Sequence, residues 1–382
     1  MIWLLLLSCG RGPRPPAPDD AWSQHGFLPA ERAQLVDELR DAVKRGQIAG
    51  GSVIVVHEGA PILESAWGLS DVAAGRPFTS DDPLRVASLS KTMLATTVAL
   101  LVHRGQLDLD APIDRTLPEW SQPKLLRTGE PVRPPTLREL LLHTGGLEGN
   151  TRHGEEGQPQ EDPAVASRRL AARGLHHRPG GAQAYSGEGY VLVAAILQTL
   201  RPGGTFEDVV RDTLLTPLGM TRSGWHDARG TGPIYQVGPT GLTVLAPAGP
   251  PTPWPHVNPA GDGVASAWDL ARLFAFHERG GVVDGAQIAP AEALAPLYQA
   301  PPGEPWAMGF RVHVGEKWGH PGVLSHPGAS GILAWIDPDC DLAVVVAVQT
   351  WIEDSLKARL RMLETMDRAC RRRAARVAHA GG

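Results

Sequence analysis

Lysine, tyrosine, phenylalanine and cysteine are scarce in this sequence. Only five of the 36 basic residues are lysines, and the 382 residues include four tyrosines, six phenylalanines and three cysteines. Positive charge is not in excess either, because 41 acidic residues leave a net charge of −5, which argues against a nucleic-acid-binding protein. Since arginine serves as the ordinary surface cation, each lysine raises the question of whether it does something that arginine cannot, such as losing a proton.

A long apolar run is also missing. The apolar residues at the N-terminus end at Leu7, whereas a membrane span takes about 20. Residues 6–10 read L-L-S-C-G, which resembles a bacterial lipoprotein signal ending at a lipidated cysteine, Cys9, although no lysine or arginine precedes it. We expect residues 1–9 to be such a signal, residues 10–27 to be a proline-rich tether, and the protein to be exported, periplasmic and lipid-anchored. The alternative is an unprocessed apolar N-terminus.

The two remaining cysteines, Cys340 and Cys370, do not form a C-x-x-C pair, which excludes a zinc ribbon. A disulfide between them is possible in an oxidising compartment. Their proximity does not follow from the sequence, however, so the pairing stays open at this point.

The order of helix-like and strand-like segments predicts an α/β (α+β) protein, and the length suggests two domains. A helix at 29–45 and a strand hairpin at 52–67 come first, helices dominate the middle, and strands at 308–314, 331–337 and 342–349 precede a closing helix at 351–371. We therefore expect an antiparallel sheet formed by both chain ends and flanked by helices, with a mostly helical domain inserted. The expected boundaries are 28–105 and 230–375 for the split α/β domain and 106–229 for the helical domain.

Ser88 and Lys91 form an S-x-x-K pattern at the start of an apolar helix expected over residues 88–103. Residues three apart share a helix face, so the hydroxyl and the amine can approach each other. The helix N-terminus favours negative charge on the serine oxygen, and a buried lysine loses solvation, which makes a neutral amine base accessible. The pattern predicts a nucleophile and its base, although a capping serine followed by a surface lysine has the same letters.

Residues 184–190 read A-Y-S-G-E-G-Y just before another apolar helix. A tyrosine at such a loop-to-helix turn can hold its hydroxyl in a cleft as a proton shuttle, which makes Tyr185 a candidate. The alternative is a half-buried packing tyrosine. Glu188 is explained equally well by a role near the site or by the preference of a first helical turn for acidic residues.

Residues 325–331 read S-H-P-G-A-S-G and run into a strand. Small residues beside a strand let a substrate lie close to the backbone, and proline is tolerated only at an edge or a bulge, where a cleft wall would be. The N–H groups of Ala329 and Ser88 could together form an oxyanion hole. A glycine-rich hairpin loop is the alternative, and H-P-G at 320–322 is a rival for the same motif.

Together the three segments resemble the serine β-lactamase and penicillin-binding protein superfamily, and within it the class C β-lactamase-like group, which includes esterases and D-aminopeptidases. Other stretches agree in order over residues 28–363: G-Q-L-D-L-D at 105–110, T-L-R-E-L-L-L-H-T-G-G-L at 136–147, and G-V-A-S followed by D-L-A-R at 263–272. The spacing from His326 to Trp335 fits that group better than the rival motif does. The resemblance implies a β-lactamase/transpeptidase-like fold.

The resemblance also implies an acyl-enzyme mechanism that requires no metal and no organic cofactor. Ser88 would be the nucleophile, while Lys91 and Tyr185 would share the proton transfers, with the identity of the base left open. His326 would stand where many β-lactamases carry a lysine. The N–H groups of Ser88 and Ala329 would bind the oxyanion.

Two departures from the family pattern bear on the substrate. Gly187 stands where β-lactamases usually have an asparagine, and H-P-G at 326–328 replaces K-T-G, which removes a cation and a hydroxyl suited to a carboxylate. With Gly187 and Gly328 at the substrate-binding positions, we expect a serine hydrolase acting on a small-molecule ester or amide, or on a peptidoglycan-like substrate.

The alternatives are a β-lactamase or D-Ala-D-Ala carboxypeptidase, and a non-catalytic module that binds peptidoglycan or a partner. No nucleic-acid partner is expected, and the membrane is expected to be reached only through the N-terminal lipid.

Overall fold

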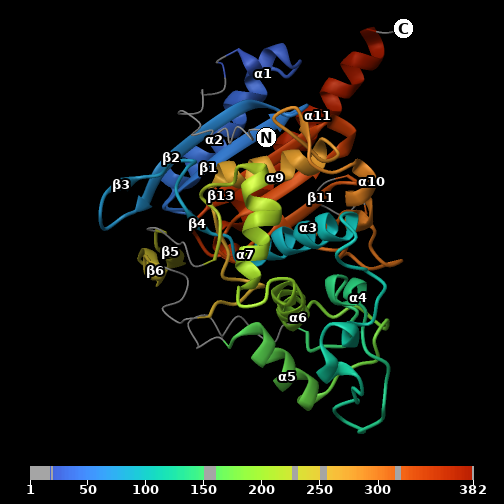
Figure 1. Cartoon of the computed structure of the whole chain (residues 1–382). Helices are drawn as coiled ribbons and strands as arrows, with labels where there is room; N and C mark the ends of the chain where they lie inside the picture. The colour runs from blue at the N-terminus through green and yellow to red at the C-terminus, as the bar shows by residue number, and fades with distance from the viewer. Residues whose placement is uncertain are drawn as a thin grey trace, which may run out of the picture.

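The computed structural model describes residues 18, 20–149, 161–225, 231–249, 256–314 and 320–380. The expected signal at 1–9, with Cys9, and half of the expected tether lie outside these residues. The described chain forms one large antiparallel sheet with helices on both faces and a group of further helices at one end (Figure 1).

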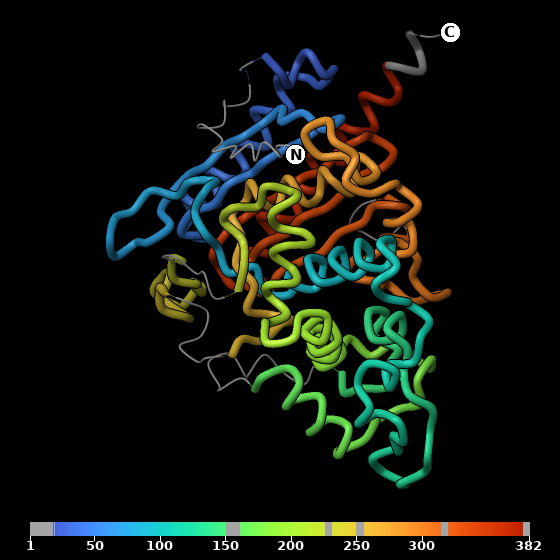
Figure 2. Tube along the Cα trace, viewed as in Figure 1, coloured from blue at the N-terminus to red at the C-terminus, as the bar shows by residue number. Residues whose placement is uncertain are grey.

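Both ends of the chain build the seven-stranded sheet, whose order is β10-β11-β12-β13-β1-β2-β3. The strands are β1 (Gly50–His57), β2 (Ala60–Asp71), β3 (Arg76–Pro77), β10 (Arg311–Val312), β11 (Leu324–Pro327), β12 (Leu333–Asp337) and β13 (Leu342–Val348). β1 pairs antiparallel with β13, so the first strand of the chain lies beside the last (Figure 2). This topology confirms the predicted fold class.

Every residue of β1 is buried, because helices cover both faces of the sheet. Successive side chains of a strand point to opposite faces. Val53 and Val55 accordingly join one apolar cluster, and Ile54 and Val56 join the other. A continuous apolar run, rather than strict alternation, is the sequence pattern of a strand buried on both sides.

One face of the sheet is covered by α2 (Pro29–Lys44) and α11 (Ile352–Ala380). Leu35 and Leu39 of α2 and Met362 and Met366 of α11 are buried in the cluster that contains Val53. The closing helix thus runs past its expected end at residue 371.

Part of the expected tether is folded onto this same face. A short helix, α1 (Ala21–Gln24), precedes α2, and Trp22 and Phe27 are only 1% and 3% exposed. The indole N–H of Trp22 donates to the carbonyl of Leu28 at 2.8 Å. The prediction of an extended tether is therefore wrong for residues 20–27, because two large apolar side chains anchor this segment in the core.

The opposite face carries α3 (Ser90–His103) and α9 (Ala267–Glu278). Leu94 of α3 and Leu270 and Phe274 of α9 are buried in the cluster that contains Ile54. All residues of α3 from Ser90 to Leu101 are buried, because the helix also packs against α6 and α10. A helix in this central position holds the side chains of its first turn rigidly.

Among the described residues, 106–225 contribute no strand to the large sheet. Their helices are α4 (Leu137–Leu141), α5 (Pro163–Arg173), α6 (Gly187–Thr199), α7 (Phe206–Val210) and α8 (Thr216–Leu218). Helices α4, α5 and α6 occupy the lower part of Figure 1. The inserted helical domain and its boundaries at 105/106 and 229/230 stay a prediction.

Short elements complete the fold. They are α10 (Ala291–Leu294) and the two-stranded ribbons β4 (Leu84–Arg85) with β7 (Val264–Ala265), β5 (Ile234–Gly238) with β6 (Gly241–Ala246), and β8 (Val282–Val283) with β9 (Ala286–Gln287). The β4–β7 ribbon matters most for the site, because it ties the segment before Ser88 to the segment that starts α9.

The strand expected at 308–314 is reduced to β10. The segment before it packs on α3 instead of pairing in the sheet, since the hydroxyl of Thr92 donates to the carbonyl of Gly309 at 2.7 Å. Gly309 has a φ of +78°, and a Cβ at this position would collide with the side chain of Ala95. Glycine therefore permits a close helix contact that an apolar strand pattern does not reveal.

Cys340 and Cys370 form a disulfide that joins the turn before β13 to α11. Both residues are buried, and their Cα atoms lie 5.8 Å apart, within the usual range for disulfides. The bond closes a loop with a sequence separation of 30 residues and fastens the last helix to the sheet.

We predict that reducing this disulfide lowers the free energy of unfolding by about 2–4 kcal/mol, because the unfolded chain regains the freedom of the closed loop. Urea unfolding with and without dithiothreitol measures the difference. The Cys340→Ala/Cys370→Ala double variant serves as the control, since dithiothreitol should not change its stability further. Equal stability of the native protein under both conditions would contradict the prediction.

Candidate active site

Ser88 lies in a tight turn just before α3. The chain forms a 3-10 turn over Ala87–Leu89 and enters α3 at Ser90, so the expected helix starts two residues later than predicted. Ala87 has a φ of +47°, a left-handed conformation that costs an alanine about 1 kcal/mol. This turn leaves Ser88 half-buried, with its side chain accessible at the end of a buried helix.

Ser90 holds the strained turn in place. Its hydroxyl donates to the carbonyl of Ala87 at 2.6 Å and accepts from the N–H of Gly263 at 3.0 Å. The N–H of Val86 in turn donates to the carbonyl of Gly263 at 2.9 Å. The segment before α9 therefore fixes the backbone on both sides of Ala87.

Lys91 lies within reach of Ser88 and is almost fully buried. Its Nζ donates to Ser88 Oγ at 3.2 Å and to the carbonyl of Ala260 at 2.9 Å, and the residue is 2% exposed. Burial lowers the pKa of Lys91 to about 7. No carboxylate forms an ion pair with this amine in the part of the chain that the structure describes, so nothing offsets the loss of hydration.

Tyr185 lies beside Ser88 and Lys91, as the sequence predicts. Lys91 Nζ lies 4.9 Å from the centre of its ring, and the Tyr185 hydroxyl is hydrogen-bonded to Ser88. Burial raises the pKa of Tyr185 above its usual value, and the hydrogen bond with Ser88 opposes this increase only in part. The hydroxyl therefore keeps its proton at neutral pH and can pass it on.

His143 packs against Tyr185, a contact that the sequence did not suggest. Its ring lies 4.5 Å from that of Tyr185, and its Nδ1 accepts a hydrogen bond from the N–H of Ser186 at 3.0 Å. Burial, followed by the nearby charge of Lys91, holds the pKa of His143 well below its usual range. His143 is thus a neutral residue that fixes the loop carrying Tyr185.

Trp306 completes the wall of rings around Tyr185. Its ring centre lies 4.7 Å from that of Tyr185 and 5.1 Å from that of His326. The side-chain amide of Gln183 holds it by donating to the Trp306 carbonyl at 2.8 Å and accepting from its N–H at 3.1 Å. Neither residue belongs to a recognisable motif, so only the fold reveals their role.

His326 lies in β11 and is 1% exposed. Its Nδ1 lies 2.8 Å from the carbonyl of Pro327, which can only accept, so Nδ1 carries the proton. Burial, then the charge of Lys91, lowers the pKa of His326 to about 3. The Nε2 atom of His326 is therefore an unprotonated acceptor, which is buried and has no hydrogen-bond partner among the described residues.

The rival histidine, His320, lies elsewhere. Its Nε2 lies 2.9 Å from the carboxylate of Asp337. One donor atom each of His320, Asp337 and Cys370 lie within 4.8 Å of one another. The structure thus brings His326, and not His320, to the S-x-x-K turn.

Gly328 brings the third segment against the turn that carries Ser88. A Cβ on Gly328 would collide with the carbonyl oxygen of Val86. In this segment the N–H of Gly328 donates to the carbonyl of Ile332 at 2.7 Å, and the carbonyl of Ala329 accepts from the N–H of Ile352 at 2.9 Å. None of the hydrogen bonds found within the described ranges uses the N–H of Ala329 or of Ser88, which leaves both donors available for an oxyanion.

Gly187 starts α6 directly after Tyr185 and Ser186. Its neighbour Glu188 pairs with Arg173, with Oε2 and Nη2 2.5 Å apart, and accepts from the N–H of Glu148 at 3.3 Å. Glu188 is thus a structural residue that ties the start of α6 to α5.

The arrangement brings a serine hydroxyl, an amine that can be neutral near pH 7 and a protonated tyrosine to one point. Two unused backbone N–H groups come from segments held in contact by Gly328. This set can move a proton off Ser88, direct its oxygen at a carbonyl carbon and stabilise the negative charge that follows.

Comparisons with known proteins agree with this chemistry. The family model described as Beta-lactamase matches residues 33–366. Over 212 residues the chain is 35% identical to the esterase EstB of Burkholderia gladioli, a match that covers 52% of this chain and 53% of the esterase. The chain therefore spans about half the length of that relative.

Two further matches cover more of the chain. Over 321 residues the chain is 27% identical to penicillin-binding protein 4 of Amycolatopsis lactamdurans, covering 80% of this chain and 81% of that protein. The solved structure of EstCE1, described as a hydrolase with promiscuous acyltransferase activity, matches with a TM-score of 0.77 at 20% identity. It covers 88% of this chain and 98% of the other, which shows a shared fold.

The family match includes all three segments that meet at Ser88. Esterases and penicillin-binding proteins both occur among the relatives. The chain therefore belongs to the beta-lactamase family, as a serine hydrolase of the esterase and penicillin-binding-protein type.

Proposed function

We propose that the protein hydrolyses an ester or amide through an acyl-enzyme on Ser88. The observation that carries this proposal is the contact between Lys91 Nζ and Ser88 Oγ at 3.2 Å, made by an amine whose pKa burial lowers to about 7. A neutral amine at this distance can take the hydroxyl proton as Ser88 attacks. A binding module without catalysis has no need of such an amine.

The steps follow from the placement of the groups. Lys91 accepts the proton of Ser88, Ser88 Oγ bonds to the carbonyl carbon, and the N–H groups of Ser88 and Ala329 stabilise the oxyanion. Tyr185 donates its proton to the leaving group and is reprotonated from Lys91. Water then cleaves the acyl-enzyme by the reverse proton path. We assign the base to Lys91, because Tyr185 keeps its proton more strongly than a free tyrosine does.

The neutral state of His326 bears on the substrate. A carboxylate needs a cation or several N–H donors, whereas His326 presents a bare acceptor nitrogen. We therefore propose an esterase or peptidase of the class C β-lactamase-like group, whose substrate offers an N–H or O–H to His326 and no carboxylate there. Gly187 and Gly328 would contact this substrate through their backbone atoms, because glycine has no side chain.

Carboxypeptidase or β-lactamase activity is the second candidate, and the match to penicillin-binding protein 4 favours it. A peptidoglycan-like substrate belongs to this candidate.

Export and lipid anchoring at Cys9 remain proposals, as does the absence of a nucleic-acid partner. No helix within the described ranges is both long and apolar enough to cross a bilayer. The buried disulfide supports an oxidising compartment, because such bonds persist there.

We predict that a fluorophosphonate probe labels the protein at Ser88. The Ser88→Ala variant should lose labelling completely, and Ser121→Ala, a change at an exposed serine, should label like the native protein. Mass spectrometry of the labelled peptide locates the adduct. A folded native sample that takes up no label would favour the non-catalytic binding module instead.

We predict that kcat/KM for an ester rises with pH through about 7 and then levels off. Lys91 is the base in its neutral form, and its pKa is lowered from 10.5 to about 7, so the active fraction grows as pH increases past that value. The pKa values of His143 and His326 lie well below this range, so these rings remain neutral throughout.

The Lys91→Arg variant tests the same assignment, because arginine cannot lose its proton. Activity should fall by about 10³-fold, while Lys44→Arg, at an exposed lysine, should leave it unchanged. If Lys91→Arg kept a tenth of native activity, Lys91 would not be the base.

We predict that a short-chain aryl ester is turned over faster than a chromogenic cephalosporin, by about tenfold or more in kcat/KM. The cephalosporin carries a carboxylate, and the neutral His326 provides no ion pair for it. Initial rates are compared side by side, with Ser88→Ala as the background for both. Faster cephalosporin hydrolysis would favour β-lactamase or carboxypeptidase activity.

A further inference from the structure

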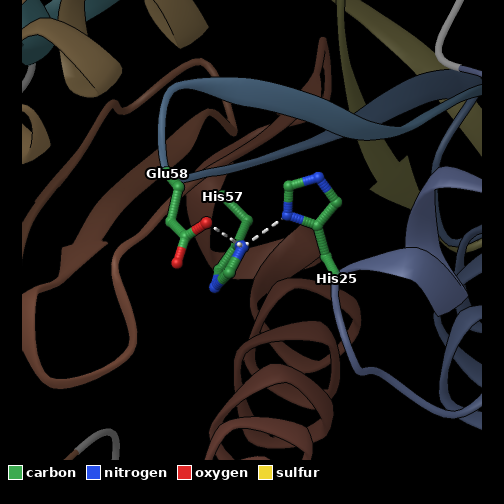
Figure 3. Close-up of side chains that lie close together, drawn as sticks. All are labelled: His25, His57 and Glu58. Carbon is green, nitrogen blue, oxygen red and sulfur yellow. Dashed lines mark hydrogen bonds and ion pairs between the residues drawn. The ribbon is translucent and has the colours of Figure 1, made fainter.

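A second group of polar side chains lies at the turn between β1 and β2, outside the active site. His57 is the last residue of β1, Glu58 follows it in the turn, and His25 ends α1. Figure 3 shows the Nδ1 atom of His25 and the carboxylate of Glu58 both pointing at Nδ1 of His57. These three potential ligand atoms all lie within 4.8 Å of one another.

The distances within this cluster are short. The two Nδ1 atoms are 2.7 Å apart, and His57 Nδ1 is 4.0 Å from Glu58 Oε2. Two nitrogen lone pairs cannot face each other at 2.7 Å, so one ring must carry a proton between them. A cation placed among the three atoms would replace that proton and use both lone pairs and the carboxylate.

The cluster is buried on one side and open on the other. His57 is 1% exposed and packs edge-on against Phe27 at 5.3 Å, whereas His25 is half-buried and Glu58 is exposed. Burial, followed by the charge of Arg373, lowers the pKa of His57 to about 4, so its ring is neutral and able to act as a ligand. An ion could enter from the Glu58 side without opening the core.

Arg373 of α11 supports two of the three residues. Its Nε donates to the carbonyl of His25 at 3.0 Å, its guanidinium lies 3.9 Å from Glu58 Oε1, and it stacks on Phe27. The other carboxylate oxygen, Oε2, faces His57. Groups that orient ligands in this way are typical of metal sites. The positive charge of Arg373 opposes a cation, while the carboxylates of Glu58 and Asp341, which both act on His57, favour one.

We propose that His25, His57 and Glu58 form a site for a divalent transition metal such as Zn²⁺. Two imidazole nitrogens and one carboxylate suit zinc better than calcium or magnesium, which prefer oxygen ligands. Two nitrogens bound tetrahedrally to zinc lie about 3.3 Å apart, so the half-buried His25 ring has to move by less than 1 Å. Water would fill the remaining position.

The metal would act on stability and not on the reaction at Ser88. The metal would fasten the segment between α1 and α2 to the β1–β2 turn. This segment carries Phe27, which is buried in the same apolar cluster as residues of α2 and α11. Leu89, next to Ser88, belongs to the cluster on the opposite face of the sheet.

The test uses the untagged full-length protein, oxidised and stripped with EDTA. Titration with ZnCl₂ by isothermal calorimetry should show one site, and a 100-fold excess of Zn²⁺ over Kd should raise the Tm by about 3 °C or more. His25→Gln and Glu58→Gln, at the two accessible ligands, should each weaken binding by about tenfold or more. Co²⁺ should give a visible absorption band that both variants lose.

His103→Gln and His177→Gln, at exposed histidines elsewhere, serve as matched controls and should bind Zn²⁺ like the native protein. The His57→Gln variant is not used to test the site, because a substitution at a buried residue can prevent folding. Absence of binding, or equal binding by the native protein and the His25→Gln variant, would overturn the proposal. Fluorophosphonate labelling of Ser88 should be the same with and without Zn²⁺, so this outcome is independent of the proposed hydrolase activity.

Discussion

The burial of the Lys91 amine, which forms no ion pair with a carboxylate among the residues that the structure describes, is the constraint on which the site depends. An ammonium group in this position would lose its hydration with no ion pair in return, so the neutral form becomes accessible near pH 7. Burial likewise holds the surrounding rings of Tyr185, His143 and His326 in their uncharged states. Among these four side chains, the Lys91 amine is therefore the group whose charge changes near pH 7.

Three distant parts of the chain keep this interior closed. Ser90 on α3 binds the segment at Gly263, Gly328 packs on the carbonyl of Val86, and Thr92 holds the carbonyl of Gly309. Each contact joins α3 or the turn just before it to a segment more than 150 residues later. The strained Ala87 can persist because its neighbours are held on both sides, and loosening any one segment would let the turn relax.

The sequence predicts what is encoded locally. Ser88 and Lys91, Tyr185, and His326 with Ala329 lie in short motifs, and these motifs together with the family resemblance made them candidates. The strand pattern at both chain ends predicted the sheet. Gln183 and Trp306 lie outside these motifs, and His143 lies in the stretch at 136–147. Their contacts with the Tyr185 segment could not be predicted, because these contacts depend on tertiary packing. The folded segment around Trp22 was missed because prolines precede it. The disulfide between Cys340 and Cys370 was left open because its cysteines meet only once α11 docks.

The pairing of β1 with β13 also has a consequence for how the protein forms. Gly51 pairs with Val348, so the centre of the sheet joins two strands that lie far apart in the sequence. Until β13 is synthesised, β1 has an unpaired edge made of apolar residues, which is a site for mispairing. Because contacts this distant in sequence form slowly, the centre of the sheet cannot form before β13 is synthesised. A truncation that removes β13 therefore removes the core of the sheet and not only its margin.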